Sequence, residues 1–229
     1  MTYTQMGRVL GATLLLLGSA LPAGAQAIFA PTGGYVERNE GVDPMAVMFN
    51  QQGLLSTYTA GVTDFDTFTS TVRHDWAYQR GGVTNEWFSR FGRRSSIVVF
   101  NFGQLVSFDA FALWNEEANG AGTATFSTSK DGVTFDALFT AISPTDNPEY
   151  QEYLADVYRF ETREALWFKM EMSDCPTAAS TSYIGCGVGE IAFRTPATTV
   201  PEPGSFALMA AGLAGFGFIV ARRRRAPAA

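Results

Sequence analysis

Residues 166–172 read Leu-Trp-Phe-Lys-Met-Glu-Met, and this heptapeptide carries the clearest secondary-structure signal in the chain. Every second side chain is apolar, at Leu166, Phe168, Met170 and Met172. A period of two places alternate side chains on opposite faces of an extended chain. The heptapeptide therefore predicts a β-strand with one face in a hydrophobic core.

Further strand patterns lie on both sides of this heptapeptide. Residues 97–102 are β-branched and aromatic, a composition typical of strands. In residues 105–114 one face is predicted to hold Val106, Phe108, Ala110, Ala112 and Trp114, while Phe111 and Leu113 indicate that the other face is partly covered. Residues 123–128 also alternate, and the pair Asp131-Gly132 favours a tight hairpin with residues 133–142 as the return strand.

The remaining segments add short strands and turns but no long helix. Residues 45–49, 54–58 and 153–160 are expected to be short strands, residues 63–70 a strand or loop, and residues 188–193 the final strand. Between residues 28 and 199, no segment keeps a helical period over three turns. The chain is therefore predicted to contain one all-β domain at residues 28–199, a β-sandwich or jelly roll.

The amino-terminal end is typical of an export signal. Residues 9–21 are apolar, follow Arg8, and precede the small-residue patterns Ala23-Gly24-Ala25 and Ala25-Gln26-Ala27. Residues 1–27 are therefore predicted to be a signal peptide that signal peptidase removes after Ala25 or Ala27. An uncleaved anchor is the alternative, but the apolar run is short and ends at the helix-breaking Pro22.

The carboxy-terminal end has three parts in a fixed order. They are a motif (Val200, Pro201, Glu202 and Pro203), an uncharged segment at residues 205–221, and a basic cluster (Arg222, Arg223, Arg224 and Arg225). Seventeen residues form about 26 Å of α-helix, enough for a single short transmembrane span. Arginines after such a span stay cytoplasmic and stop transfer.

This tail, residues 200–225, resembles the PEP-CTERM sorting signal of Gram-negative bacteria, which is also described under an ice-binding C-terminal label. The resemblance implies processing by an exosortase near the Pro-Glu-Pro motif, in hosts that often make exopolysaccharide. The protein would be held in the inner membrane only transiently and then delivered to the cell surface, the outer membrane or the exterior. A permanent membrane anchor is the alternative.

The charge of the domain and its two cysteines limit the classes of function that the protein can have. The ends hold five of the 16 basic residues and one of the 22 acidic residues, which leaves 11 basic and 21 acidic residues between them. A domain this acidic repels phosphate backbones, so nucleic acid is excluded as a partner. The two cysteines, Cys175 and Cys186, are expected to form a disulfide in an exported chain, with two reduced buried thiols as the alternative.

Several segments together resemble a discoidin-like (coagulation-factor C-type) domain over residues 63–194. They are residues 97–103, 111–115, the Ser-Lys-Asp-Gly-Val-Thr-Phe hairpin at residues 129–135, 167–170, and Gly-Val-Gly-Glu-Ile-Ala-Phe at residues 187–193. The resemblance implies a jelly-roll sandwich that binds glycans, lipids or proteins through loops at one end. No binding residue is carried over, because those loops vary, and Cys175 and Cys186 depart from the family's usual disulfide between the domain termini.

Candidate catalytic residues are few. His74 is the only histidine, and neither a nucleophile elbow nor a zinc-protease motif is present in the sequence. Glu116 and Glu117 could form half of a glycosidase site, but neighbours in an extended chain point apart, so a solvated loop is the expectation. No catalytic residue is therefore predicted.

The sequence offers candidate residues for two kinds of binding site. Asn115, Glu116 and Glu190 are candidate ligands of a structural calcium ion, because calcium binds oxygen donors. Four aromatic residues, Trp76, Tyr78, Trp87 and Trp114, are candidates for a sugar-stacking platform, although aromatic residues of a sandwich usually fill its core.

The sequence as a whole favours an exported, non-enzymatic surface or matrix protein, with an extracellular polysaccharide as its candidate partner. One alternative is a secreted hydrolase with an unrecognised site. Another is a purely structural or ice-contacting protein, for which Thr123, Thr125 and Thr128 are too few to form a convincing flat array.

Overall fold

The computed structural model describes residues 26–41, 43–80, 83–177 and 182–197. The elements, in chain order, are β1 (Ile28–Phe29), β2 (Gly33–Arg38), the 3₁₀ helix η1 (Met45–Phe49), α1 (Phe65–Thr71), β3 (Gln79–Arg80), β4 (Val83–Thr84), β5 (Trp87–Phe88), β6 (Ser96–Asn115), β7 (Thr123–Ser129), β8 (Asp136–Ile142), β9 (Asp156–Ser173) and β10 (Gly187–Arg194). The signal peptide up to Ala25, the sorting motif, the apolar segment at residues 205–221 and the four arginines lie outside the described residues.

The sheet-rich, sandwich-like fold is confirmed. An eight-stranded antiparallel sheet has the order β1-β10-β6-β9-β7-β8, with β2 paired to β6 and β5 paired to β10. The heptapeptide at residues 166–172 lies in β9, where it pairs with β6 on one side and β7 on the other. Phe168, Met170 and Met172 are buried in the core as predicted, whereas Leu166 is half-buried and lies outside the core cluster.

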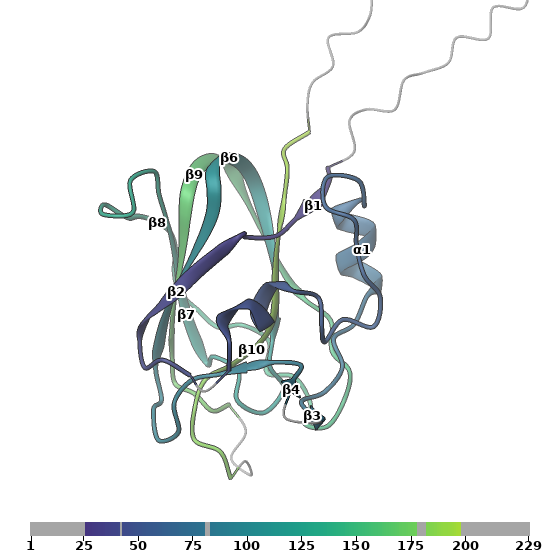
Figure 1. The fold of residues 1–229 in the computed structure, drawn as a ribbon, viewed down its shortest axis with the longest axis vertical. Coiled ribbons are helices and arrows are strands. Elements are labelled where there is room, and N and C mark those ends of the chain that lie inside the picture. Colours follow the sequence, from purple (N-terminus) through teal and green to yellow (C-terminus); the bar gives the residue numbers. More distant parts are fainter. Residues whose placement is uncertain (1–25, 42, 81–82, 178–181, 198–229) are drawn as a thin grey trace, which may run out of the picture.

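Two long strands, β6 and β9, connect the two layers of the sandwich. The first half of β6 pairs with β2, and its second half pairs with β10. Pairing with β9 shifts register between Asn101 and Val106, next to Gly103, whose φ is 78°. Figure 1 shows both strands arching over at this point. A bulge with glycine in a left-handed conformation bends a sheet, so β6 belongs to both layers.

A second bulge in β6 changes which face its side chains occupy. The predicted common face of residues 106–114 is wrong, because a register shift lies between Phe108 and Ala110. Phe108 packs in the core between the layers, whereas Ala110, Ala112 and Trp114 pack in a second cluster on the outer side. Coverage on both sides is confirmed, since all of residues 110–114 are fully buried.

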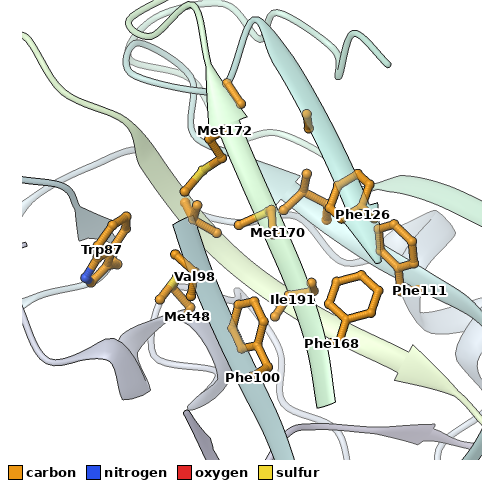
Figure 2. Packing of buried hydrophobic residues seen from close by; sticks show 14 of the residues in the cluster. Met48, Trp87, Val98, Phe100, Phe111, Phe126, Phe168, Met170, Met172 and Ile191 are labelled. Atoms are coloured by element: carbon orange, nitrogen blue, oxygen red, sulfur yellow. The ribbon is translucent and has the colours of Figure 1, made fainter. Parts of the chain in front are cut away.

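The main core lies between the layers and is rich in aromatic and methionine side chains. Figure 2 shows Phe168, Met170 and Met172 of β9 beside Val98 and Phe100 of β6. The second cluster lies under α1 and joins Phe65 and Phe68 to Trp114, Tyr153 and Ala192. These two clusters account for most of the aromatic residues of the domain.

The segment at residues 63–70 was predicted to be a strand or loop, and most of it forms α1. The Asp64 carboxylate accepts a hydrogen bond from the Thr67 amide at 2.8 Å, which caps the helix. Phe65 and Phe68, one turn apart, are both buried. Seven residues are too few to show a helical period in sequence. Residues 45–49, predicted as a strand, likewise form η1.

The two ends of the domain differ in what they carry. β1 pairs with β10, and the chain enters and leaves at the upper end of Figure 1, while β3 and β4 lie at the lower end. The loops around β3 and β4 therefore lie at the end of the domain opposite the point where the described chain ends at residue 197.

Within the described residues, no helix is both long and apolar enough to cross a membrane.

Candidate functional site

A cavity of about 380 Å³ opens among the loops beside the β3–β4 hairpin. Its lining combines aromatic rings, carboxylates and small side chains: Asp43, Ala77, Tyr78, Thr84, Phe88, Glu116, Glu117, Ala118, Asn119, Tyr150 and Tyr183. These residues come from five separate segments of the chain. A concave, mainly apolar surface with a few polar groups is the usual form of a ligand site.

The carboxylates of Glu116 and Glu117 lie in the floor of this cavity. The residues follow the end of β6, where the chain turns, and they are only 1% and 2% exposed. Glu116 Oε2 accepts hydrogen bonds from the amides of Ala118, at 3.0 Å, and Asn119. The expectation of a solvated loop with carboxylates pointing apart is therefore wrong, because both side chains are buried and the turn brings their oxygens within 4.8 Å of each other.

A third carboxylate, Glu86, joins the pair from the segment before β5. Oxygens of Glu86, Glu116 and Glu117 lie within 4.8 Å of one another, and all three side chains are buried. Glu86 Oε1 accepts a hydrogen bond from the Tyr153 hydroxyl at 2.7 Å, and Glu117 Oε1 accepts one from the Ala77 amide at 3.1 Å. These three residues are called the carboxylate cluster below.

Burial and mutual repulsion control the charge of this cluster. Burial raises the pKa of Glu86 and of Glu116 well above the ordinary value, and the neighbouring carboxylates raise both further. Burial also raises the pKa of Glu117, although hydrogen bonds from the backbone oppose it. The site therefore favours whatever reduces its negative charge, either bound protons or a bound cation.

His74 packs beside the cluster instead of facing the cavity. Its Nδ1 lies 2.8 Å from the Asp75 carbonyl oxygen and 3.2 Å from Glu86 Oε1, and its ring is fully buried. Burial lowers the pKa of His74 to about 4, so it is neutral at pH 7. A Cβ at Gly53 would lie 2.0 Å from the His74 ring, so glycine is required for this approach. His74 is a packing residue in this position.

The predicted disulfide between Cys175 and Cys186 is confirmed, and it supports one wall of the cavity. The residues that follow Tyr183 are tied to the cluster loop, since Asn119 Nδ2 donates to the carbonyls of Tyr183 and Gly185. The Gly187 amide in turn donates to the Asn119 carbonyl at 2.6 Å. The disulfide loop therefore positions the loop that carries Glu116 and Glu117.

The four aromatic candidates do not form one platform. Trp87 and Trp114 are fully buried in the two hydrophobic clusters, so neither can stack on a ligand. Trp76 is 42% exposed and packs edge-on against Tyr150, with ring centroids 6.0 Å apart. Tyr78 lines the cavity. Accessible rings at this end therefore include Trp76 and Tyr78, and also Tyr150 and Tyr183, two residues that the sequence pattern did not reveal.

The three candidate calcium ligands are separated in the structure. The Asn115 side chain holds the cluster loop, because its Oδ1 accepts from the Ala121 amide at 2.9 Å and its Nδ2 donates to the Ala121 and Thr145 carbonyls. Glu190 on β10 is also buried, but its Oε2 accepts from the Gln51 amide at 3.0 Å and its carboxylate is not part of the carboxylate cluster. Of the three candidates, Glu116 lies in the carboxylate cluster.

A second depression, of about 450 Å³, lies beside the β7–β8 hairpin. Its walls are charged and solvated, and Lys130 there pairs with Glu164 at 3.0 Å while both side chains are more than half exposed. Exposed ion pairs of this kind contribute little and hold no fixed geometry. The cavity above the carboxylate cluster is the better candidate, since its polar groups are buried and fixed.

Comparison with known proteins identifies the tail. Residues 199–225 match the family model described as a PEP-CTERM protein-sorting motif, which confirms the prediction made for residues 200–225. No curated protein sequence matches the chain.

Solved structures that resemble the chain include three carbohydrate-binding modules. One is chitosan-binding module 1 of a chitosanase/glucanase from Paenibacillus sp. IK-5 (21% identity, TM-score 0.38, 47% of this chain and 74% of the module). Another is a CBM32 module from Clostridium perfringens in complex with GalNAc-β-1,3-galactose (10%, 0.39, 48% and 75%). A third is the CBM32 of AlyQ in complex with 4,5-unsaturated mannuronic acid (10%, 0.43, 72% and 96%). At this level of similarity nothing about the site follows from these neighbours.

Proposed function

We propose that this protein is exported, is sorted through its PEP-CTERM tail by an exosortase-type enzyme, and binds an extracellular glycan through the cavity above the carboxylate cluster. The role is that of a non-enzymatic binding module at the cell surface or in its matrix. The observation that carries the proposal is the combination, in one cavity, of aromatic rings with buried carboxylates.

The chemistry of the cavity matches the two kinds of surface that a sugar presents. A pyranose ring has apolar C–H faces and a rim of hydroxyl groups. The negative face of an aromatic ring such as Tyr78 attracts polarised C–H groups. Fixed acceptors such as the Glu116 and Glu117 carboxylates take hydrogen bonds from hydroxyls, and their burial makes a missing bond costly. A site of this composition selects a polyhydroxylated ligand.

The backbone at Tyr150 supports a binding role for its ring. Tyr150 has φ of 57°, a left-handed conformation that costs a bulky residue about 1–2 kcal/mol. Its side chain is nevertheless 73% exposed at the cavity and packs mainly against Trp76. An exposed aromatic residue in a strained conformation adds little to folding, so the ring is better explained by what it contacts outside the protein.

A hydrolase is the less favoured alternative. A retaining glycosidase needs two carboxyl groups about 5–5.5 Å apart, and an inverting enzyme needs a larger gap that admits water. Oxygens of Glu116 and Glu117 lie within 4.8 Å of each other, which is closer than either arrangement. His74 is buried and lies behind Glu86. A purely ice-contacting role is also less favoured, because Thr123 and Thr125 are half-buried and Thr128 is buried.

The position of the cavity suits a protein held by its carboxy-terminal tail. The described chain ends at residue 197, at the opposite end of the domain from β3 and β4. While the tail is in the membrane, a cavity beside β3 and β4 would face away from it. Display of a binding site toward the exterior fits both the transient anchor and delivery to the surface.

Binding is tested with the full chain, purified in detergent, on an array of bacterial and plant polysaccharides. We expect retention on at least one polymer, and we expect Tyr150→Ala to weaken it about tenfold, since an aromatic contact contributes up to about 1.5 kcal/mol. Leu105→Ala is the matched control, because Leu105 is also exposed and apolar but lies at the arch of β6. Binding that Leu105→Ala reduces as much as Tyr150→Ala, or no retention at all, would contradict the proposal.

Sorting is tested separately in a host that makes an exosortase. Replacing Pro201, Glu202 and Pro203 by alanine is expected to leave a larger, membrane-held product on a gel. Unchanged processing would favour a permanent anchor.

A further inference from the structure

We propose that Glu86, Glu116 and Glu117 form a binding site for a calcium ion in the floor of the cavity. This site differs from the set Asn115, Glu116 and Glu190 expected from the sequence, with which it shares only Glu116. It does not depend on the identity of any glycan.

The first reason is an uncompensated concentration of negative charge. Three carboxylates with oxygens within 4.8 Å of one another are each at most 2% exposed. No lysine or arginine whose side chain the structure describes lies within 4.0 Å of their oxygens, and the basic side chain that the described structure places there is the His74 imidazole, 3.2 Å from Glu86 Oε1. Buried carboxylates without a lysine or arginine partner are rare in proteins unless they hold a metal ion or a proton.

The second reason is that the cluster has free oxygens. The protein holds one oxygen of each carboxylate: Glu86 Oε1 through Tyr153, Glu117 Oε1 through the Ala77 amide, and Glu116 Oε2 through two backbone amides. Glu86 Oε2 and Glu117 Oε2 are buried and have no hydrogen-bond partner in the part of the chain that the structure describes. Each of these two carboxylates is held in place through one oxygen while its second oxygen is unsatisfied, which is how the carboxylate ligands of a metal ion are arranged.

The spacing of the cluster suits calcium. Calcium takes six to eight oxygen ligands at about 2.3–2.6 Å, so two oxygens on opposite sides of the ion are about 4.8 Å apart. Oxygens within 4.8 Å of one another can therefore share one calcium ion without a large movement of the chain. Magnesium needs shorter distances and a strict octahedron. Glu116 and Glu117 also line the cavity, so water or a ligand hydroxyl can complete the coordination shell.

The alternative is that the cluster carries protons in place of the ion. The two states make opposite predictions for the isosteric variants Glu86→Gln and Glu117→Gln. If the cluster only binds protons, adding calcium changes nothing in any variant. If it binds calcium, each variant loses the response to calcium, while its fold without metal is kept or strengthened because one repelling charge is gone.

The experiment uses the full chain in detergent after treatment with a chelator. Terbium luminescence sensitised by tyrosine at the cavity reports occupancy, competition by calcium gives the affinity, and thermal unfolding with calcium or chelator reports stabilisation. We expect saturable binding of about one ion per chain and a higher unfolding temperature with calcium. Glu117→Gln is expected to weaken calcium binding at least tenfold while unfolding cooperatively without metal.

The matched control is Glu190→Gln, which removes an equally buried carboxylate outside the cluster. It is expected to bind calcium as the unchanged chain does. The proposal is overturned if the unchanged chain shows no response to calcium or terbium, if Glu117→Gln binds as well as the unchanged chain, or if Glu190→Gln abolishes binding while Glu117→Gln keeps it.

Discussion

Removal of the disulfide by the double substitution Cys175→Ala and Cys186→Ala is expected to destabilise the domain by about 3 kcal/mol. The two cysteines are 11 positions apart, and the chain-entropy relation for a closed loop of that length gives a little under 3 kcal/mol at 25 °C. Alanine is chosen over serine because both positions are fully buried, where a hydroxyl group would add a desolvation cost of its own.

The assay is urea unfolding of a fragment of residues 26–197, followed by tryptophan fluorescence. Trp87 and Trp114 are fully buried, so their emission reports loss of the core. With a slope of about 2 kcal/mol per molar urea, a loss of 3 kcal/mol lowers the midpoint by about 1.5 M. Reductant should bring the unchanged fragment close to the double variant and leave the variant itself unaffected.

The same substitution should also loosen the candidate site. The loop that the disulfide closes holds Asn119 through the carbonyls of Tyr183 and Gly185, and Asn119 belongs to the loop of Glu116 and Glu117. The folded double variant is therefore expected to bind the glycan ligand several-fold more weakly than the unchanged domain. A midpoint shift below about 0.5 M, or a reductant effect on the variant as large as on the unchanged fragment, would refute the loop-entropy reasoning.

Three further predictions concern other parts of the domain. Tyr150→Gly should be more stable than Tyr150→Ala by about 1 kcal/mol in urea unfolding, because alanine keeps the cost of φ at 57° and glycine does not; equal midpoints would show that the conformation is not strained. Burial raises the pKa of Glu190 well above its unfolded value, so the proton it binds stabilises the native state fully below about pH 4.5 and this contribution is lost as the pH rises. Glu190→Gln should therefore be more stable than the unchanged domain by about 1–3 kcal/mol at pH 7, with the difference gone at pH 4, and a difference that is the same at both pH values would contradict this assignment. Asp64→Ala should cost about 1 kcal/mol through the lost cap of α1, and because the Thr67 amide lowers the pKa of Asp64, the loss should shrink as the pH falls below about 3.8; an unchanged midpoint at pH 7 would mean that the cap does not matter.

The sequence alone was sufficient to predict a structural element where its local pattern agrees with the tertiary packing. Residues 168–172 alternate because β9 lies between two strands with one face in the core, and residues 188–193 form the final strand as predicted. The cysteine pair and the PEP-CTERM motif were also predictable, since each depends on residue type and order along the chain. The all-β class follows from the number of such short patterns.

Other features needed the folded chain because they depend on bulges or on short elements. The bulge between Phe108 and Ala110 moves the following side chains to the other face, and alternation in the sequence cannot show where a register shift lies. Helix α1 has a recognisable cap in Asp64 but only seven residues, too few for a period to stand out. The aromatic residues Trp87 and Trp114 are equally ambiguous in sequence, since core and surface sites favour the same side chains.

The candidate site was decided almost entirely by tertiary structure. Glu86 lies 30 positions from Glu116 in the sequence, and the two meet because β5 and β6 both pair with β10. The turn after β6 then places Glu117 against Glu116, where an extended chain would separate them. The sequence by itself therefore determined the fold class, the disulfide and the PEP-CTERM sorting motif. Burial and strand pairing, which are properties of the whole folded chain, determined that the three carboxylates of the cluster lie together.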